Sequence, residues 1–264
     1  MLSEADRQRP VTGSPVAVVT GASRGLGAGL AARLAERGFS LGLCARHVPP
    51  LPEGLDPGRA VRAAVDVTDA DALDAFAAEV TKRLGPIDLW VNNAGLLGPI
   101  APARDAGPRE VRDALLVNVL GVHLGSAAFA RSVRARAVRA RTEPGPRPTL
   151  VNISSGAARS VYPGWSAYGP SKAAVEHLSR HLAAEEPDLA VFAVAPGVVD
   201  TDMQVAIRAA SAEDFPAVER FRGLHRDGAW NSPAWVADHL VALWDGTWAP
   251  DELAVRIPAE PRPG

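Results

Sequence analysis

The chain has 264 residues, of which 47% are hydrophobic, and its 28 basic and 30 acidic side chains leave a formal charge of -2. This length and hydrophobic content allow one large buried core, so a single domain is expected. The near balance of charge gives no reason to expect nucleic acid or an anionic membrane as a partner, and the single cysteine, Cys44, excludes an intrachain disulfide and a thiolate metal site.

Residues 1–15 are polar and contain prolines, so we expect a flexible N-terminal tail without the apolar region of a signal peptide. The longest apolar run, from Leu115 to Ala130, contains polar residues and is predicted to be a buried helix, not a membrane span. A buried free thiol fits a reducing compartment. We therefore expect a cytoplasmic protein.

The first chemical signal is a short strand followed by glycines. VAVVT, at 16–20, is a β-branched run, and GASRGLG, at 21–27, leads from it into a helical pattern. The first glycine permits a tight turn, and the two later ones leave room for a pyrophosphate at the N–H groups of the helix N-terminus. The spacing Gly-x-x-x-Gly-x-Gly differs from the commoner dinucleotide fingerprint. The cofactor contacts predicted here are Gly21, Ser23, Arg24, Gly25, Leu26 and Gly27.

The second strand predicts which dinucleotide is bound. The run SLGLCAR ends at Arg46, where many dinucleotide-binding folds place an acid that holds the ribose hydroxyls. Arg46 together with Arg24 can clamp a 2′-phosphate, although either arginine alone is more often a solvated charge. The sequence therefore favours NADP(H) over NAD(H).

A Pro-rich loop at 47–58 precedes the third strand, VRAAV, and the motif DVTD. Thr68 with Asp71 predicts a helix N-cap, which opens an amphipathic helix that ends at Leu84. Asp66, at the end of the strand, is placed to meet an adenine amino group.

The fourth strand, IDLWV, runs into NNAG at 92–95, which we interpret as both a brace between strands and a floor for the cofactor. Alternating strands and helices up to this point predict a parallel α/β sheet with right-handed crossovers. The cofactor contacts added by these two strand ends are Asp66, Val67, Asn92, Ala94 and Gly95.

The helix that Pro108 opens carries Asn118 as an isolated amide among apolar residues, and a buried amide needs partners. Asn118 either makes a structural hydrogen bond or holds a water that relays protons to Lys172. The arginine-rich stretch 131–147 has no interleaved aromatic residues, so we predict an exposed helix end and a loop in place of a nucleic-acid site.

The stretch from Leu150 to Lys172 reads as a strand, a polar turn and the start of a helix, and it supplies Ser155, Tyr168 and Lys172. Helical spacing puts Tyr168 and Lys172 on one face. Moving the pKa of a tyrosine from about 10 to about 7 needs roughly 4 kcal/mol, and a cation at about 4 Å in an effective dielectric of about 20 supplies about that much. We expect Lys172 to lower the pKa of Tyr168 and Ser155 to bind a carbonyl oxygen, which makes a proton-transfer site.

The remainder of the chain supplies the other side of the site. A sixth strand turns at Pro196, and the contacts predicted after it are Pro196, Gly197, Val199 and Thr201, whose hydroxyl can meet a nicotinamide amide. Residues 202–231 lack a strong period, and we predict a mobile lid over the substrate. Ser232 should cap a further helix with Pro233 in its first turn; LAVRI is a last strand, and 259–264 a tail.

Together these motifs resemble the short-chain dehydrogenase/reductase family, from Val16 to about Ile257. They occur in the family's order and approximate spacing: TGASRGLG at 20–27, DVTD at 66–69, NNAG at 92–95, Asn118, ISS at 153–155, Tyr168 with Lys172, and PGVVDT at 196–201. Within the family, APGVVDTDMQ and the AR at 45–46 are similar to the sepiapterin reductase and benzil reductase branch.

The resemblance implies a Rossmann-type, doubly wound parallel sheet of seven strands in the order 3-2-1-4-5-6-7, in one domain over 16–258. It also implies a homodimer or homotetramer and a catalytic tetrad of Asn118, Ser155, Tyr168 and Lys172. Such a protein transfers hydride from NADPH to a ketone or aldehyde, with Tyr168 as general acid. The alternatives are an NADP-dependent alcohol dehydrogenase that runs in the oxidative direction and a non-catalytic NADP(H)-binding regulator.

Overall fold

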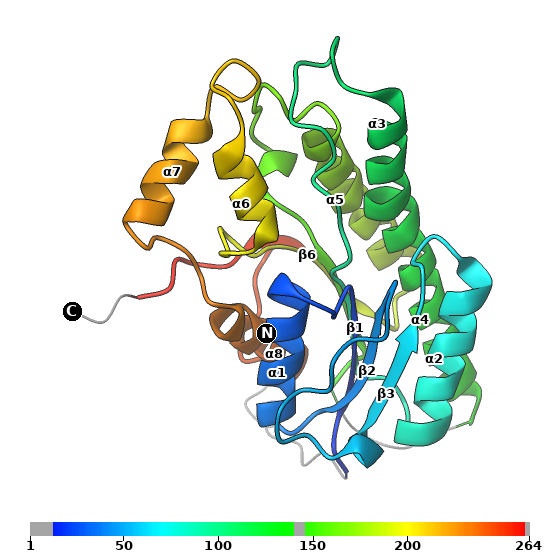
Figure 1. Cartoon of the computed structure of the whole chain (residues 1–264). Coiled ribbons are helices and arrows are strands. Elements are labelled where there is room, and N and C mark those ends of the chain that lie inside the picture. The colour runs from blue at the N-terminus through cyan, green and yellow to red at the C-terminus, as the bar shows by residue number, and fades with distance from the viewer. Residues whose placement is uncertain (1–12, 140–145, 262–264) are drawn as a thin grey trace.

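The computed structural model describes residues 13–139 and 146–261, so most of the predicted N-terminal tail lies outside it (Figure 1). One sheet of seven parallel strands has the order β3-β2-β1-β4-β5-β6-β7, which confirms the predicted fold class and strand order. The strands are β1 (Val16–Thr20), β2 (Ser40–Ala45), β3 (Ala60–Ala64), β4 (Leu89–Asn92), β5 (Thr149–Ile153), β6 (Ala190–Ala195) and β7 (Ala254–Arg256).

Helices connect most of the strands and cover both faces of the sheet. The connection from β2 to β3 contains only a short 3₁₀ turn at Pro57–Arg59. The helices are α1 (Gly25–Glu36), α2 (Ala70–Leu84), α3 (Pro108–Leu115), the π-helical turn η3 (Leu116–Leu120), α4 (Gly121–Arg139), α5 (Tyr168–Glu185), α6 (Asp202–Ala209), α7 (Val218–Arg226) and α8 (Pro233–Asp245).

The β1 strand shows why the sheet is buried on both faces. Ala17 and Val19 pack into a core with α1 and α8, whereas Val16 and Val18 pack into a second core with α2, α4 and α5. Successive side chains of a strand point to opposite faces, so a strand covered on both sides must be apolar throughout. Figure 1 shows α1 and α8 on one side of the strands and α2 and α4 on the other.

The strand order places a crevice at the centre of the sheet. β1 pairs with β2 on one side and with β4 on the other, so the connections leave β1 in opposite directions. Ligands of open α/β sheets bind at such a switch point, outside the carboxyl ends of the strands. The glycine turn after β1 and the polar turns after β4 and β5 meet there.

The N-cap of α2 differs from the prediction. Asp69 accepts a hydrogen bond from the N–H of Ala72 at 3.0 Å, so the cap is Asp69 and not Thr68. Thr68 is instead bound to Asp66, to which it donates both its N–H and its hydroxyl. The cap of α8 is as predicted, because Ser232 accepts from the N–H of Trp235 and Pro233 occupies the first turn.

The segment predicted as an irregular lid contains two short helices, α6 and α7, which lie beyond one end of the sheet (Figure 1). The side chains of Phe215 and Phe221 are buried in a cluster around Trp165. Helices of eight and nine residues are too short to give a strong sequence period, which is why the pattern was not evident. The mobility of this lid stays a prediction.

The stretch Pro108–Ala135 has the length and composition of a membrane span, with a mean hydropathy of 1.4 over its most apolar window. Half of that window is buried inside the structure, and the core helices of water-soluble proteins have the same property. Within it, Phe129 and Val133 pack against the sheet. Ala114 and Val122 are also buried, whereas Leu115, Leu116 and Leu120 are exposed at the end of α3 and in η3.

The described part of the arginine-rich stretch makes structural contacts. Arg131 pairs with Asp74 at 2.6 Å, and Arg134 pairs with Glu186 at 3.0 Å. Arg147 donates to two backbone carbonyls just before β6. The middle of the stretch lies outside the described residues.

Candidate active site

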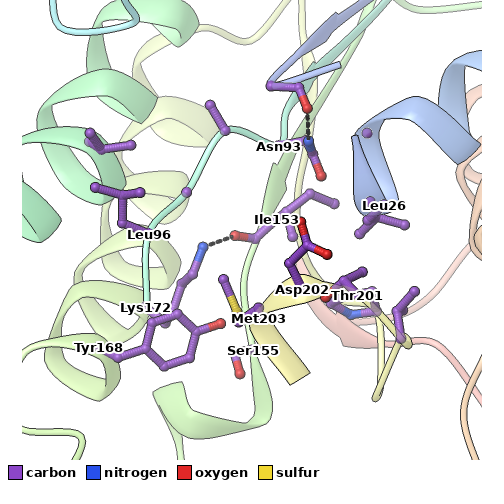
Figure 2. Close-up of a pocket in the computed structure, with 18 of the residues that line it drawn as sticks. Leu26, Asn93, Leu96, Ile153, Ser155, Tyr168, Lys172, Thr201, Asp202 and Met203 are labelled. Atoms are coloured by element: carbon purple, nitrogen blue, oxygen red, sulfur yellow. Dashed lines mark hydrogen bonds between the residues drawn. The ribbon is translucent and has the colours of Figure 1, made fainter. Parts of the chain in front are cut away.

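A cleft of about 940 Å³ opens at the carboxyl ends of the strands, and Figure 2 shows part of its wall. This volume suits a cofactor together with a small substrate. Of the predicted site residues, only Asn92 and Asn118 do not line it. Those that do are Gly21, Ser23, Arg24, Gly25, Leu26, Gly27, Arg46, Asp66, Val67, Ala94, Gly95, Ser155, Tyr168, Lys172, Pro196, Gly197, Val199 and Thr201.

The glycine turn leaves no room for side chains. Gly21 has a φ of 67°, and a Cβ there would lie 2.7 Å from the Cα of Ala94. A Cβ on Gly27 would lie 2.3 Å from the carbonyl oxygen of Gly21. No side chain among the described residues caps the start of α1, so its first N–H groups are available to an anion. This cradle fits the pyrophosphate of a dinucleotide.

The two asparagines after β4 have different roles. Asn92 is buried, accepts a hydrogen bond from the indole N–H of Trp90, and donates to Ser126 and Asn152. Asn92 is therefore a brace between β4, β5 and α4 and does not line the cleft, and its contact with the cofactor stays a prediction. Its neighbour Asn93 lines the cleft and donates to the carbonyl of Thr20, because successive side chains of an extended chain point to opposite faces. This alternation was the signal in the sequence that distinguishes them.

Ser155, Tyr168 and Lys172 meet at one wall of the cleft (Figure 2). Tyr168 is the first residue of α5, and Lys172 follows one turn later. The phenol of Tyr168 is hydrogen-bonded to the hydroxyl of Ser155, which also accepts from the N–H of Ala157. Lys172 Nζ donates to the carbonyl oxygen of Ile153 at 2.8 Å and lies 5.8 Å from the centroid of the Tyr168 ring.

The acidity of Tyr168 is opposite to the prediction. Burial raises the pKa of the phenol, and the hydrogen bond from Ser155 only partly offsets this. The ammonium of Lys172 does not lower that pKa as expected, because it lies beside the ring and is bonded to Ile153. Burial also lowers the pKa of Lys172 to about 8. At neutral pH the phenol is therefore protonated and the lysine is mostly charged.

Asn118 lies behind the cleft in the π-helical turn and is fully buried. Its amide accepts from the N–H of Leu96 at 2.8 Å and donates to the carbonyl of Leu96 at 2.7 Å and to Ser171 at 3.0 Å. These bonds fix the backbone beside Lys172, since a Cβ on Gly95 would lie 3.3 Å from the Asn118 oxygen and 3.7 Å from Lys172 Nζ. A water relay through Asn118 stays a prediction.

Two arginines line the cleft, Arg24 in the glycine turn and Arg46 directly after β2. Arg24 forms an ion pair with Asp202 at 2.5 Å, with both side chains well exposed. Arg46 is exposed beside Asp66. Hydrogen bonds from Thr68 lower the pKa of Asp66, and the charge of Arg46 adds to this. The Asp66 carboxylate is therefore ionised at neutral pH.

Aromatic rings form the wall on the other side of Tyr168. The ring of Trp165 lies 5.4 Å from that of Tyr168, stacks on Phe215 at 4.6 Å and lies 4.9 Å from Tyr162. Phe221, from α7, also lines the cleft. Tyr162 and Trp165, which precede Tyr168 in the sequence, are thus at once part of a small core cluster and part of the cleft wall.

Asn231 supports the cleft, a role that no sequence pattern predicted. Its N–H donates to the carbonyl of Val198, and its side-chain amide donates to the carbonyls of Pro196 and Pro258. Its side-chain oxygen accepts from the N–H of Glu260. The start of the predicted C-terminal tail is therefore bound, and it braces the turn after β6. These partners are distant in sequence, so no local pattern indicated them.

The histidine pair on α5 lies outside the cleft. His177 and His181 are exposed at their ring nitrogens, which approach to 3.3 Å. Within residues 13–139 and 146–261 there is no group of three side chains able to hold a metal ion.

Comparisons with known proteins give consistent results. The family model for short chain dehydrogenases matches residues 15–212. The benzil reductase ((S)-benzoin forming) of Bacillus subtilis (strain 168) is 31% identical over 235 residues, which are 86% of this chain and 91% of that protein. The sepiapterin reductase of Meriones unguiculatus is 40% identical over 216 residues, which are 76% and 80% of the two chains. The crystal structure of a short chain dehydrogenase from Burkholderia cenocepacia J2315 in complex with NADP matches with a TM-score of 0.71 and 25% identity, covering 94% of this chain and 89% of that one.

Proposed function

The chain belongs to the short-chain dehydrogenase family, whose members are oxidoreductases of CH–OH and C=O groups, and we propose that it is an NADPH-dependent carbonyl reductase in the cytoplasm. The observation that carries this proposal is the group formed by Ser155, Tyr168 and Lys172 at the wall of a dinucleotide-sized cleft. Its substrate is a ketone or an aldehyde. The intact tyrosine and lysine argue against a non-catalytic regulator.

The protonation state of the site supports the reductive direction. The Tyr168 phenol is protonated at neutral pH, as burial only raises its pKa from an already high value, so it is a proton donor before the reaction begins. When bound, the nicotinamide supplies hydride to the carbonyl carbon. Ser155 holds the carbonyl oxygen and Tyr168 gives it a proton, while the ammonium of Lys172 holds the nicotinamide ribose.

The preference for NADPH rests on Arg24 and Arg46. The crowded glycine turn and the free N–H groups of α1 fit a pyrophosphate, and Arg24 and Arg46 line the same cleft, which supports their binding of an adenosine 2′-phosphate. Guanidinium groups bind phosphate by paired, charge-assisted hydrogen bonds. A related short chain dehydrogenase has been crystallised in complex with NADP, which agrees with this choice.

The test is an assay of NADPH and NADH oxidation with benzil and with a small panel of other diketones, aldehydes and quinones. We expect turnover with NADPH, and we expect Arg46→Asp to lower the ratio of kcat/KM for NADPH to that for NADH by about 10- to 100-fold, the loss expected for one charge-assisted phosphate contact.

The control is Arg104→Asp, which makes the same charge change at a side chain that is 80% exposed and outside the cleft. It should leave the cofactor ratio unchanged. A wild-type protein that binds neither cofactor would refute the proposal, and one that prefers NADH would refute the role of Arg46. An enzyme that oxidises the corresponding alcohols with NADP but reduces none of the ketones would favour the dehydrogenase alternative.

We also propose that the protein is a homodimer or a homotetramer. The apolar face of α3, η3 and α4 exposes Leu115, Leu116 and Leu120, with exposed fractions of 38–40%. Together with Leu178 of α5 these residues line an apolar hollow. A contiguous exposed apolar surface of this kind is more often a protein–protein interface than a surface that stays exposed to solvent. Sedimentation equilibrium should give a mass of two or four chains, and a dimer that persists in Leu120→Lys would exclude this face.

A further inference from the structure

The segment 202–231 contributes Phe215 and Phe221 to the aromatic cluster, and three of its arginines differ in their partners. Arg208 pairs with Asp200 at 3.1 Å, and Arg222 pairs with Glu219 at 2.6 Å. Arg220, which is exposed on α7, lines the cleft and forms no ion pair with any residue in the described part of the chain. The guanidinium of Arg220 donates its side-chain hydrogen bond to a phenol and not to a carboxylate.

The phenol is that of Tyr162, which orients the guanidinium. Arg220 Nη1 donates to the Tyr162 hydroxyl at 2.7 Å, and its guanidinium carbon lies 5.8 Å from the centroid of the same ring. Two contacts on one ring restrict a side chain that is otherwise free in solvent. A guanidinium has several further N–H donors, so most of its capacity for hydrogen bonds remains available to a ligand.

The aromatic wall connects this cation to the reacting group. Tyr162 contacts Trp165 at 4.9 Å between ring centroids, and Trp165 contacts Tyr168 at 5.4 Å. Tyr162, Trp165, Tyr168 and Arg220 all line the same cleft, so a substrate with its carbonyl at Tyr168 can extend along these rings with its other end toward Arg220. The phosphates of the cofactor are already assigned to the glycine turn, Arg24 and Arg46. Arg220 is therefore available to bind a charged group of the substrate.

We propose that Arg220 and Tyr162 form an anion subsite, and that the enzyme reduces aromatic ketones which carry a carboxylate at the end remote from the reacting carbonyl. The inference rests on the proposed function and specifies its substrate class. Hydride from NADPH adds to the carbonyl carbon and the proton of Tyr168 adds to the oxygen, which gives a secondary alcohol and NADP⁺. The carboxylate itself is unchanged and serves only for recognition.

The test compares benzil with 4-carboxybenzil, which differ by one carboxylate on a ring. The wild-type kcat/KM should be higher for the acid. Arg220→Met should lower the value for the acid by about 10- to 100-fold and leave that for benzil within about 3-fold, because only the acid uses the charge-assisted contact. Added salt should reduce the ratio of kcat/KM for 4-carboxybenzil to that for benzil in the wild type, because salt screens the exposed guanidinium.

The matched control is Arg226→Met, on the same helix but outside the cleft. It should leave kcat/KM unchanged for both diketones. Tyr162→Phe provides a second variant, which keeps the charge and the ring but removes the hydroxyl that orients Arg220. It should lower kcat/KM for 4-carboxybenzil by a few-fold only. An equal loss for both diketones in Arg220→Met would show a structural role and overturn the subsite. The absence of any loss would overturn it as well.

The failure of the proposed function can be distinguished from the failure of this subsite. If the wild type binds NADPH but reduces neither diketone, binding of 4-carboxybenzil can still be measured from the quenching of tryptophan fluorescence. Tighter binding of the acid than of benzil, lost in Arg220→Met but not in Arg226→Met, would support the subsite and reject only the reaction. Equal binding of the two diketones would reject the subsite.

Discussion

Tyr168→Phe is expected to lower kcat for carbonyl reduction by about 10²- to 10⁴-fold, the range for loss of a general acid. The substitution removes only the phenol oxygen, and the ring keeps its contacts with Trp165 and with the rest of the aromatic wall. Binding of NADPH should therefore stay within about 3-fold of the wild type. The expected result is a protein that is folded and loaded with cofactor but cannot transfer the proton.

The chain supplies its own control, because its other tyrosine lies on the same wall. Tyr162→Phe removes an identical oxygen from a ring that has no role in proton transfer, so kcat for the neutral substrate benzil should stay close to that of the wild type. Single-turnover kinetics would separate the chemical step from product release. A Tyr168→Phe variant that keeps more than about a tenth of the wild-type rate of the chemical step would contradict its assignment as the general acid.

Lys172 is expected to make the stability of the protein depend on pH. Its pKa is about 8 in the folded chain, compared with a reference value of 10.5, because its ammonium is buried. Between these two values the unfolded chain binds the proton more tightly than the folded chain, so stability rises with pH across that window. At about 1.4 kcal/mol for each pKa unit, the free energy of unfolding of the wild type should rise by about 3 kcal/mol relative to Lys172→Met between pH 7 and pH 10.5.

Urea unfolding of both proteins at several pH values measures this difference. Other groups that titrate in the window, such as the buried thiol of Cys44 and the phenol of Tyr168, are common to both proteins and cancel. The only other lysine in the sequence, Lys82, is exposed on α2, and Lys82→Met should show no such trend. Parallel pH profiles for the wild type and Lys172→Met would contradict the burial of a charged lysine.

Local patterns were sufficient for the framework of the site. The glycine turn follows an apolar strand directly, and the spacing of Tyr168 and Lys172 is that of one helical turn, so the sequence alone predicted where both would lie. The strand order followed from the family resemblance, and the pairing of β1 with β2 and β4 confirms it.

Properties that depend on distant neighbours could not be predicted in the same way. The pKa of Tyr168 depends on burial by groups from several elements, and a sequence argument that counted only the nearby lysine gave the wrong sign. The contribution of Asn231 depends on the carbonyls of Pro196 and Pro258, far from it along the chain. Asn92 is different, because the alternation of side chains along β4 is a local pattern from which its position behind the cleft wall could have been predicted.

The bonds of Asn231 also bear on when the protein can complete its cleft during synthesis. The glycine turn and Arg46 leave the ribosome early, together with the strands that hold them, and domains that emerge from the ribosome fold as units. The turn at Pro196 is fully braced only when Pro258 and Glu260 can reach Asn231. Because α8 packs against α1 in the core beneath the glycine turn, the single domain folds as one unit, and its cleft is complete only after residue 260 has left the ribosome.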